Sequence, residues 1–559
     1  MPTPLEIKGQ VASEGFAAGP IWLAQDRLVL SYERKDTWQA EAQALADCVA
    51  TASGQTAELV ESAQGDAADI LEFQLAMLED DTFVEAASEL IEAGLGADMA
   101  WRAVLDDEIA GYEASDDEYF RARAADLRDV KDRVLVALTG AAVETIPKGS
   151  IYLSDDIAPS LFLSHDWSGG GLALRDGSVT GHVAMLARQR GIPALVGLGD
   201  FVCPDNGSAL LHGGQQTLII SPSEQTRQQF DLARMKFDAA RLRAQDFSDR
   251  PAVTADGTAV SVMVNIADPA EVEDIPIQHV DGVGLMRTEF LFGHASGLPG
   301  EEIQYLAYKK VLGWSQGKPV TIRTVDAGGD KPIRGFTEDE MNPFLGVRGI
   351  RLALKNQDIF RLQIRALLRA GVHGRLKVML PMVAVPEELD DTVKLFEAEA
   401  SALAQEGVAY QMPKIGIMVE IPSVAILPDR FSKASFLSIG SNDLTQYVLA
   451  ASRDNGKLAY LAKADDPAVL ALIANVAQYG AEHGVDVSLC GEAGSDVSII
   501  PKLLKAGVTT LSVAASRIGL VKSTIADIDL GSDRKNRLFD EAHAGFSHKL
   551  GVLHGDNKK

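Results

Sequence analysis

The chain has 559 residues, of which 46% are hydrophobic and 23% are charged, and its formal net charge is −27. This length exceeds what one hydrophobic core usually holds, so we expect a soluble protein of several domains. The negative charge disfavours binding to nucleic acid or an anionic membrane and favours a basic protein partner. Three cysteines cannot form a disulfide framework. Since no signal peptide or apolar run of membrane-spanning length is present, we expect a cytoplasmic protein.

The first part of the chain predicts an α/β domain interrupted by helices. Residues 1–25 hold short strand-like runs, and residues 26–145 are rich in helix formers. In the run ILEFQLAML at 70–78, apolar residues recur at helical spacing, which predicts a core-facing helix of a bundle. Acidic clusters such as 106–108 are either solvated helix faces or a docking surface for a basic partner. Strand and turn patterns return over 146–222, so we expect 1–25 plus 146–222 to form one domain with 26–145 inserted into it.

A histidine stands at a turn in the second half of that domain. Small residues precede His182, apolar residues recur at helical spacing from Val183 to Ala187, and Gly191 ends the run. This predicts that His182 lies at a helix N-terminus, where free backbone N–H groups and the helix dipole favour negative charge. An imidazole in that place is suited to carry a phosphoryl group, the alternative being a cap or surface residue.

The rest of the chain predicts a barrel. Residues 223–250 are polar and rich in Arg and Gln, and we expect a helical linker there. Over 251–530, eight strand-like runs alternate with helical ones, from AVSVMVNI at 259–266 to TTLSVAAS at 509–516. This is the count and length of a (β/α)₈ barrel. A doubly wound open sheet is the alternative, although it does not usually need so regular an alternation. The predicted fold class is α/β.

Nearly every barrel run turns polar at its carboxyl end, which is where such barrels carry their active site. The polar residues at these ends include Asn265, Arg287, Arg323, Asp326, Glu420, Asn442, Asp443, Cys490 and Glu492. Arg287, Arg323 and Arg453 offer planar donors that suit phosphate and carboxylate groups, and Arg348 is a candidate fourth. Lys331, in a glycine-containing turn, is a further candidate for contacting phosphate.

Two carboxylates and a thiol at these ends indicate more specific chemistry. Glu420 and Asp443 follow neighbouring runs without a His or Cys ligand pattern, which suits Mg²⁺, the alternative being acids paired with the arginines. Cys490, with an ordinary pKa of about 8.5, is mostly protonated at neutral pH and can give a proton to a carbanion. A covalent nucleophile is less favoured because no His pattern would activate the thiol, and a buried structural Cys is the remaining alternative.

Motifs over nearly the whole chain resemble Enzyme I of the phosphoenolpyruvate-dependent phosphotransferase system. They are GVGLMRTEFLF, TIRTVDAGGDK, NPFLGVRGIR, GIMVEIPSV, SIGSNDLTQYVLAASRDN, Cys-Gly-Glu at 490–492, EFQLAMLEDD and DDEYFRARAADLRDV. The resemblance implies a swivelling phosphohistidine domain, a helical insert that docks the carrier protein HPr, and a barrel that binds phosphoenolpyruvate (PEP) and forms a homodimer. Residues 531–559 match nothing in that pattern, and their role stays unassigned.

The resemblance also implies residue roles. PEP would be bound by Arg287, Arg323, Arg453, Asn442 and Asp443. Glu420 and Asp443 would hold Mg²⁺, His182 would take the phosphoryl group, and Cys490 would protonate enolpyruvate to give pyruvate. The family usually has Gly-Gly-Arg-Thr-Ser-His-Thr around its histidine, whereas Val179, Gly181 and Val183 here replace the Arg, the Ser and the second Thr.

Two rival functions remain. An ATP-dependent PEP synthase or pyruvate phosphate dikinase shares the histidine domain and the barrel, but residues 1–145 are too few for its nucleotide-binding domain. The other rival is a regulatory phosphoryl relay, or an interaction protein that has lost turnover. The altered surroundings of the histidine favour it, and the complete set of strand-end residues disfavours it.

Overall fold

The computed structural model describes residues 4–23, 32–62, 66–114, 118–140, 145–179, 181–203, 207–292, 298–329, 333, 335–337, 340–452, 458 and 460–531. The chain divides into two compact units, Met1–Asp238 and Ala239–Lys559. Both contain strands and helices, which confirms the α/β fold class. Within the described residues, every helix is too short or too polar to cross a lipid bilayer.

The first unit is built on one mixed sheet. Its strands are β1 (Leu5–Lys8), β2 (Gln10–Ser13), β3 (Phe16–Leu23), β4 (Ile151–Ser154), β5 (Gly171–Leu174), β6 (Ala194–Val196), β7 (Ser208–His212) and β8 (Thr217–Ile220). They lie in the order β1-β8-β7-β3-β4-β5-β6-β2. β3 pairs in parallel with β4, as Ile21 does with Ile151, so the chain returns to the same sheet after the helical segment. Two short helices, α6 (Pro159–Ser164) and α7 (His182–Gln189), connect strands of this sheet.

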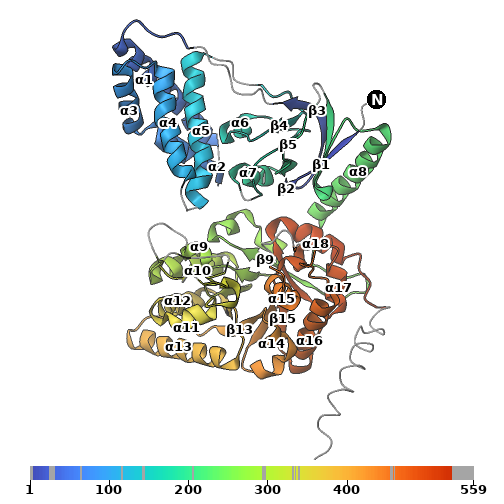
Figure 1. Ribbon diagram of the computed structural model, residues 1–559. Coiled ribbons are helices and arrows are strands. Elements are labelled where there is room, and N and C mark those ends of the chain that lie inside the picture. Colours follow the sequence, from blue (N-terminus) through green and yellow to red (C-terminus); the bar gives the residue numbers. More distant parts are fainter. Residues whose placement is uncertain are drawn as a thin grey trace, which may run out of the picture. The chain divides into compact units, whose positions relative to one another are not determined.

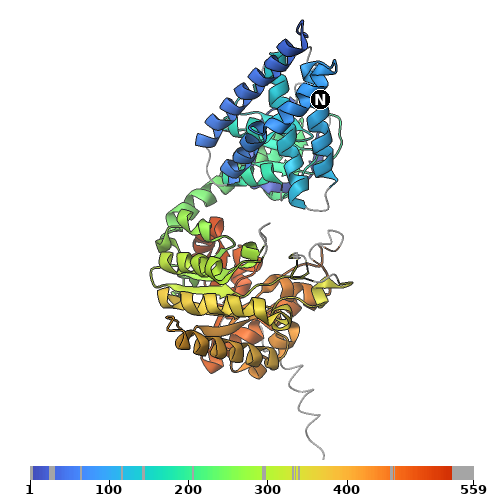
Figure 2. The same cartoon turned by 90° about the vertical axis from the view of Figure 1, so that its left-hand side faces the viewer.

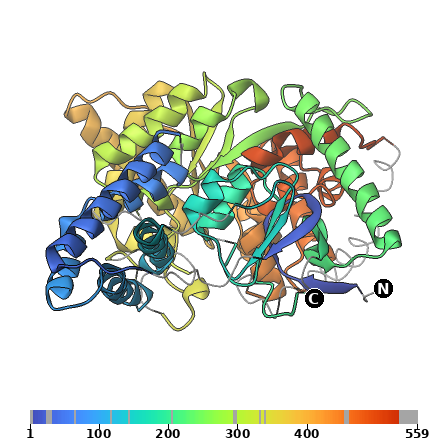
Figure 3. The same cartoon turned by 90° about the horizontal axis from the view of Figure 1, so that it is seen from above.

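Helices fill the interval between β3 and β4. They are α1 (Trp38–Ser62), α2 (Asp66–Leu78), α3 (Asp81–Glu92), α4 (Ala97–Glu113) and α5 (Glu118–Thr139), which are blue in Figures 1 and 3. The predicted helix at 70–78 forms the carboxyl-terminal part of α2. Leu45, Trp101, Leu105 and Leu127 are fully buried among these helices, so the segment has a hydrophobic core of its own.

One helix, α8 (Glu224–Phe247), occupies the predicted linker. It is strongly polar, and Phe230 is its buried residue within the described chain. The polar composition that led us to expect a connector therefore reflects a helix with little core-facing surface.

The second unit contains a closed parallel barrel, as predicted. Its strands are β9 (Ser261–Ile266), β10 (Val283–Met286), β11 (Pro319–Arg323), β12 (Arg375–Leu380), β13 (Lys414–Val419), β14 (Phe436–Ile439), β15 (Asp486–Leu489) and β16 (Thr510–Ala514). Each of the eight predicted runs overlaps one of these strands. The strands are apolar because both of their faces are covered, the inner face by the barrel core and the outer face by helices.

The covering helices follow the strands along the chain. They are α9 (Glu289–Phe292), α10 (Glu301–Trp314), α11 (Ile350–Lys355), α12 (Gln357–Ala370), α13 (Pro386–Gln405), α14 (Pro422–Ile426), α15 (Ser441–Leu449), α16 (Pro467–His483), α17 (Ile500–Lys505) and α18 (Ile518–Ile525). Figure 2 shows α12 and α13, in yellow and orange, side by side on the outside of the barrel. This arrangement leaves the carboxyl ends of the strands to form one face.

Candidate functional site

The strand ends bring the predicted residues to one end of the barrel. Arg323 is the last residue of β11, Glu420 follows β13, and Cys490 follows β15. Asp443 lies in the first turn of α15, directly after β14. Because all these strands are parallel, their carboxyl ends open on the same face.

Buried ion pairs connect two of the predicted arginines. Arg348 is fully buried, with Nη2 lying 2.9 Å from Asp326 Oδ2 and Nη1 lying 3.2 Å from Asp443 Oδ1. Arg323 Nη1 lies 3.2 Å from the same Asp326 oxygen, and its Nη2 lies 3.1 Å from Glu289 Oε1. Burial opposes the charge of Arg348, but the carboxylates of Asp326 and Asp443 outweigh that effect and raise its pKa. Both guanidinium groups therefore stay charged at the barrel end.

Glu420 has no direct ion pair among the described residues. Its side chain is buried, and Oε1 accepts a hydrogen bond of 2.6 Å from the backbone N–H of Met382. Oε2 is also buried, and within the described residues it has no hydrogen-bond partner. Burial, with the nearby charges of Asp443 and Asp326, raises the pKa of Glu420 to about 8. A bound cation would give Oε2 a partner and would offset the repulsion between the carboxylates.

The donor set fits a cation that takes only part of its ligands from protein. Among the described residues, no cluster of three or more His, Cys, Asp or Glu side chains is arranged to hold a metal ion. Glu420 and Asp443 can provide two carboxylate ligands. The remaining ligands would then come from substrate or water. That is the usual mode of Mg²⁺ binding, in which one or two carboxylates join substrate phosphates.

Cys490 lies inside the barrel. Its thiol is buried beside Leu285, Met379, Met418 and Phe436, and Sγ lies 3.6 Å from the carbonyl oxygen of Ile439. Burial raises the pKa of the thiol, which keeps it protonated at neutral pH. The environment thus supports a proton donor and argues against a thiolate nucleophile.

Asparagine side chains order the loops around the thiol. Asn442 Nδ2 donates to Glu492 Oε1 at 3.0 Å, and Asn442 Oδ1 accepts from the backbone N–H of Glu492 at 2.9 Å. Asn265 Nδ2 donates to the carbonyl oxygens of Cys490 and Ser512, at 3.2 and 3.1 Å. The sequence analysis placed both residues at the carboxyl ends of strand-like runs, and both hold the segment that carries Cys490.

The remaining predicted residues divide into exposed and undescribed ones. Arg287 follows β10 directly and is exposed, with its backbone N–H donating to the carbonyl oxygen of Ile266 at 2.9 Å. Arg453 and Lys331 lie outside the described residues, as does Thr180 beside the histidine. Arg287 is therefore a predicted arginine whose guanidinium is open to solvent.

Glu289 is a site residue that the sequence analysis missed. It pairs with Arg323, and its Oε1 also accepts from the backbone N–H of Asp326 at 2.9 Å. A signal was available, since Glu289 follows Arg287 by two positions after the same strand. A lone acid in the first turn of a helix, however, resembles an ordinary helix start.

His182 begins helix α7, as predicted. Its ring lies against the inserted helices, with Nδ1 3.4 Å from Asp126 Oδ2 of α5. Val179 is partly buried against the core of the α/β domain, and Val183 is buried in it. Gly181 precedes the helix without a side-chain cap. Val179 and Val183 thus serve packing, and none of the three altered residues offers a polar side chain to His182.

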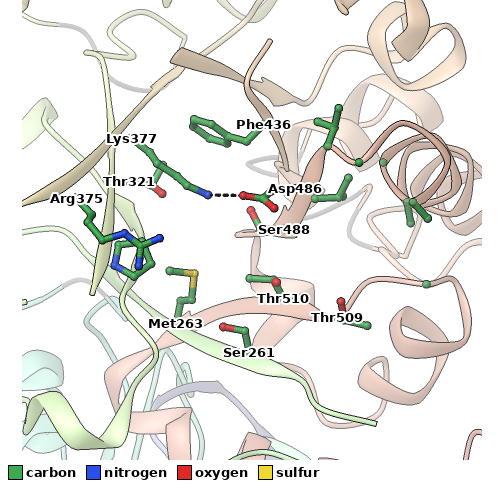
Figure 4. A pocket seen from close by; sticks show the side chains of 18 residues that line it. Ser261, Met263, Thr321, Arg375, Lys377, Phe436, Asp486, Ser488, Thr509 and Thr510 are labelled. Carbon is green, nitrogen blue, oxygen red and sulfur yellow. Dashed lines mark hydrogen bonds and ion pairs between the residues drawn. The ribbon is translucent and has the colours of Figure 1, made fainter. Parts of the chain in front are cut away.

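The barrel also has a cavity of about 540 Å³ at its other end (Figure 4). Its lining includes the first residues of β9, β11, β12, β15 and β16, and is therefore at the amino ends of the strands. Lys377 and Asp486 face each other across it, with Nζ and Oδ2 3.0 Å apart. In such barrels this end contributes to stability, and the candidate site lies at the opposite end.

Comparison with known proteins agrees with this geometry. The family profiles "PEP-utilising enzyme, PEP-binding domain", "PEP-utilising enzyme, N-terminal" and "PEP-utilising enzyme, mobile domain" match residues 241–530, 8–123 and 146–224. These matches define the class as PEP-utilising enzymes.

Curated relatives are more specific. The phosphoenolpyruvate-protein phosphotransferase of Geobacillus stearothermophilus is 37% identical over 534 residues, which cover 92% of this chain and 91% of the relative. That of Enterococcus faecalis is 36% identical and covers 94% of both chains. The chain belongs to the phosphoenolpyruvate-protein phosphotransferases, and it is a transferase.

Proposed function

We propose that this enzyme transfers the phosphoryl group of PEP to Nε2 of its own His182 and then to an HPr-type carrier protein, releasing pyruvate. The observation that carries the proposal is the barrel end, where charged arginines, an uncompensated buried carboxylate and a protonated thiol meet. These are the groups that a substrate with a carboxylate and a phosphate, and an enolate product, require. In this proposal the protein acts in the cytoplasm as a homodimer formed through the barrel domain.

Cationic side chains bind the substrate. Arg287, Arg323 and Arg453, with the loop of Asn442, bind the carboxylate and phosphate of PEP, and Lys331 contacts the phosphate. Arg348 contributes by holding Asp326 and Asp443 in place, since its guanidinium is fully buried between them. Arg348 thus shapes the site through these two carboxylates.

Glu420 and Asp443 hold Mg²⁺. When bound, this ion offsets charge on the transferring phosphoryl group and on the enolate oxygen. Oε2 of Glu420 supports this assignment, because this buried oxygen has no hydrogen-bond partner within the described residues and buried polar atoms usually have one.

Bond changes in the first step balance without a nucleotide. The lone pair of His182 forms a bond to phosphorus while the bond from phosphorus to the enol oxygen breaks. Cys490 Sγ–H then gives its proton to the methylene carbon of enolpyruvate, and solvent restores the thiol proton. The conversion of enolpyruvate to its ketone draws the transfer forward. His182 must afterwards turn towards the inserted helices, which we assign to carrier docking.

The experiment supplies labelled PEP and Mg²⁺ without nucleotide, and then adds purified HPr. Acid-labile label on the protein that passes to HPr is the expected result. Label that appears only when ATP is present would instead identify a dikinase-type reaction, and label that stays on the protein after HPr is added would identify a relay of another kind.

A further inference from the structure

His182 meets a buried carboxylate from the inserted helices. Its side chain is 15% exposed, and Nδ1 lies 3.4 Å from Oδ2 of Asp126, whose side chain is fully buried. Within the described residues, Nδ1 is buried without a hydrogen-bond partner, and so is the second oxygen of Asp126. The separation is an ion-pair distance, slightly longer than a hydrogen bond, so a small ring rotation brings the two atoms into hydrogen-bond contact.

Arg123 also contacts Asp126. Arg123 Nη1 lies 3.1 Å from the same Oδ2, and the Arg123 guanidinium lies over the ring of Phe73 in α2, 4.6 Å from its centre. Arg123 and Asp126 are both on α5, so the carboxylate is fixed by its own helix and by α2. A carboxylate anchored in this way can orient a neighbouring ring.

A second contact fixes α5 to the α/β domain. Asp129, one turn further along, accepts hydrogen bonds from the backbone N–H and the hydroxyl of Ser160 at 2.9 and 2.7 Å. Gln74 also donates to Asp129, at 3.0 Å. α7 packs beside α2 and α6 in the same region (Figure 1). The face that carries Asp126 is therefore docked against the domain that carries His182.

We propose that Asp126 is a positioning residue that keeps the proton of His182 on Nδ1 and leaves Nε2 as the atom that exchanges the phosphoryl group. Two facing acceptors would repel each other, so an ionised Asp126 favours the tautomer with the proton on Nδ1. This inference rests on the proposed function, and it adds a specific role for the inserted helices. Asp126 acts when α7 faces α5, that is, when the phosphoryl group passes to the carrier.

The atoms balance in that step. The Nε2–phosphorus bond of phosphorylated His182 breaks as the carrier's nucleophile bonds to phosphorus, and the electron pair returns to Nε2. The proton stays on Nδ1 throughout. While the ring is phosphorylated it carries positive charge, and the carboxylate of Asp126 compensates this charge without accepting the proton.

The tautomer can be measured directly on the full chain labelled with ¹⁵N-histidine and not phosphorylated. The signals of His182 are assigned by their loss in His182→Gln. We expect the parent protein to show Nδ1 as protonated, and Asp126→Ala to move the population by several-fold towards the Nε2–H form. Asp126→Asn keeps the size of the side chain but replaces the carboxylate by an amide that can donate to Nδ1, so we expect it to move the population towards the Nε2–H form as well. It covers the case in which the alanine variant does not fold.

Asp129→Ala is the matched control, because it loosens the same interface through Ser160 and Gln74 without touching His182. Unchanged His182 signals in Asp126→Ala, or an equal change in Asp129→Ala, would overturn the proposal. These results do not depend on PEP labelling, so they can fail separately from the proposed function. With labelled enzyme, we expect Asp126→Asn to slow transfer to HPr by about 10- to 100-fold, as loss of a partner that orients a histidine does elsewhere. Transfer at the parental rate would also contradict the proposal.

Discussion

Arg348 and Asp443 form a buried ion pair, with Nη1 and Oδ1 3.2 Å apart. They come from the segment before α11 and from the first turn of α15, which are distant in the chain. Arg348 also pairs with Asp326, so one guanidinium joins two carboxylates from separate loops. Such a pair contributes geometry more than stability, because the cost of taking the charges out of water offsets much of their attraction.

Replacing Arg348 by methionine should destabilise the protein severely. Arg348→Met leaves Asp326 and Asp443 buried without this partner, and breaking a buried pair costs about 3–5 kcal/mol. Denaturant titration, followed by a spectroscopic signal of the barrel, gives the free energy of unfolding that checks this value. Arg243→Met is the control, since Arg243 pairs with Asp527 at the surface and exposed pairs contribute about 0–1 kcal/mol. Equal losses in the two variants would show that burial of the Arg348 pair has no special role.

Glu420 should make the stability of the metal-free protein fall as the pH rises. Its folded pKa is about 8 and its ordinary value is 4.5, so the folded state keeps a proton that the unfolded state has released. The contribution is complete below about pH 4.5 and is lost as the pH rises through about 8. Glu420→Gln removes this part of the pH dependence. The free energy of unfolding of the variant minus that of the parent should therefore increase between about pH 4.5 and about pH 8. A pH-independent difference between parent and variant would contradict the raised pKa.

Cation binding should release protons below pH 8 for the same reason. Mg²⁺ requires an ionised carboxylate, so its binding displaces the proton of Glu420. Calorimetric titrations with MgCl₂ in buffers of different ionisation enthalpy count the protons released. We expect proton release to decrease towards zero above pH 9 and to disappear in Glu420→Gln, whereas persistent release in that variant would assign the proton to another group.

Cys490→Ala should slow pyruvate formation far more than it weakens PEP binding. Loss of a general acid typically costs about 10²–10⁴-fold in rate, and the proposed mechanism gives this role to the buried thiol. Rapid-quench measurement of pyruvate, beside equilibrium binding of PEP, separates the two effects. Cys203→Ala serves as the control, since this half-buried thiol belongs to the other unit. If binding and turnover fell equally, the thiol would have a structural or binding role.

The barrel could be predicted because its strands are continuous apolar runs that each turn polar at the end. The alternation of such runs with helices is a local property, and Arg323, Glu420 and Cys490 stand at the predicted ends. The two-part α/β domain was also readable, since apolar β3 and β4 flank a long helical segment.

Which charges pair could not be read from the sequence, because that depends on loops that meet in space. Glu289 is an unremarkable helix residue until its contact with Arg323 is known. Asp126 lies in the motif DDEYFRARAADLRDV, which the resemblance assigns to the carrier-docking insert, yet the fold buries its side chain beside His182. In each case, the chain gives the residue type and tertiary packing supplies the partner.

The most direct test of the account is the location of the phosphoryl group after incubation with labelled PEP and Mg²⁺. His182→Ala is compared with His165→Ala, a histidine of the same α/β domain that lies beside Trp167 rather than at the start of α7. We predict that acid-labile label disappears in His182→Ala and persists in His165→Ala. Label at the parental level in His182→Ala would contradict the central claim that this histidine receives the phosphoryl group.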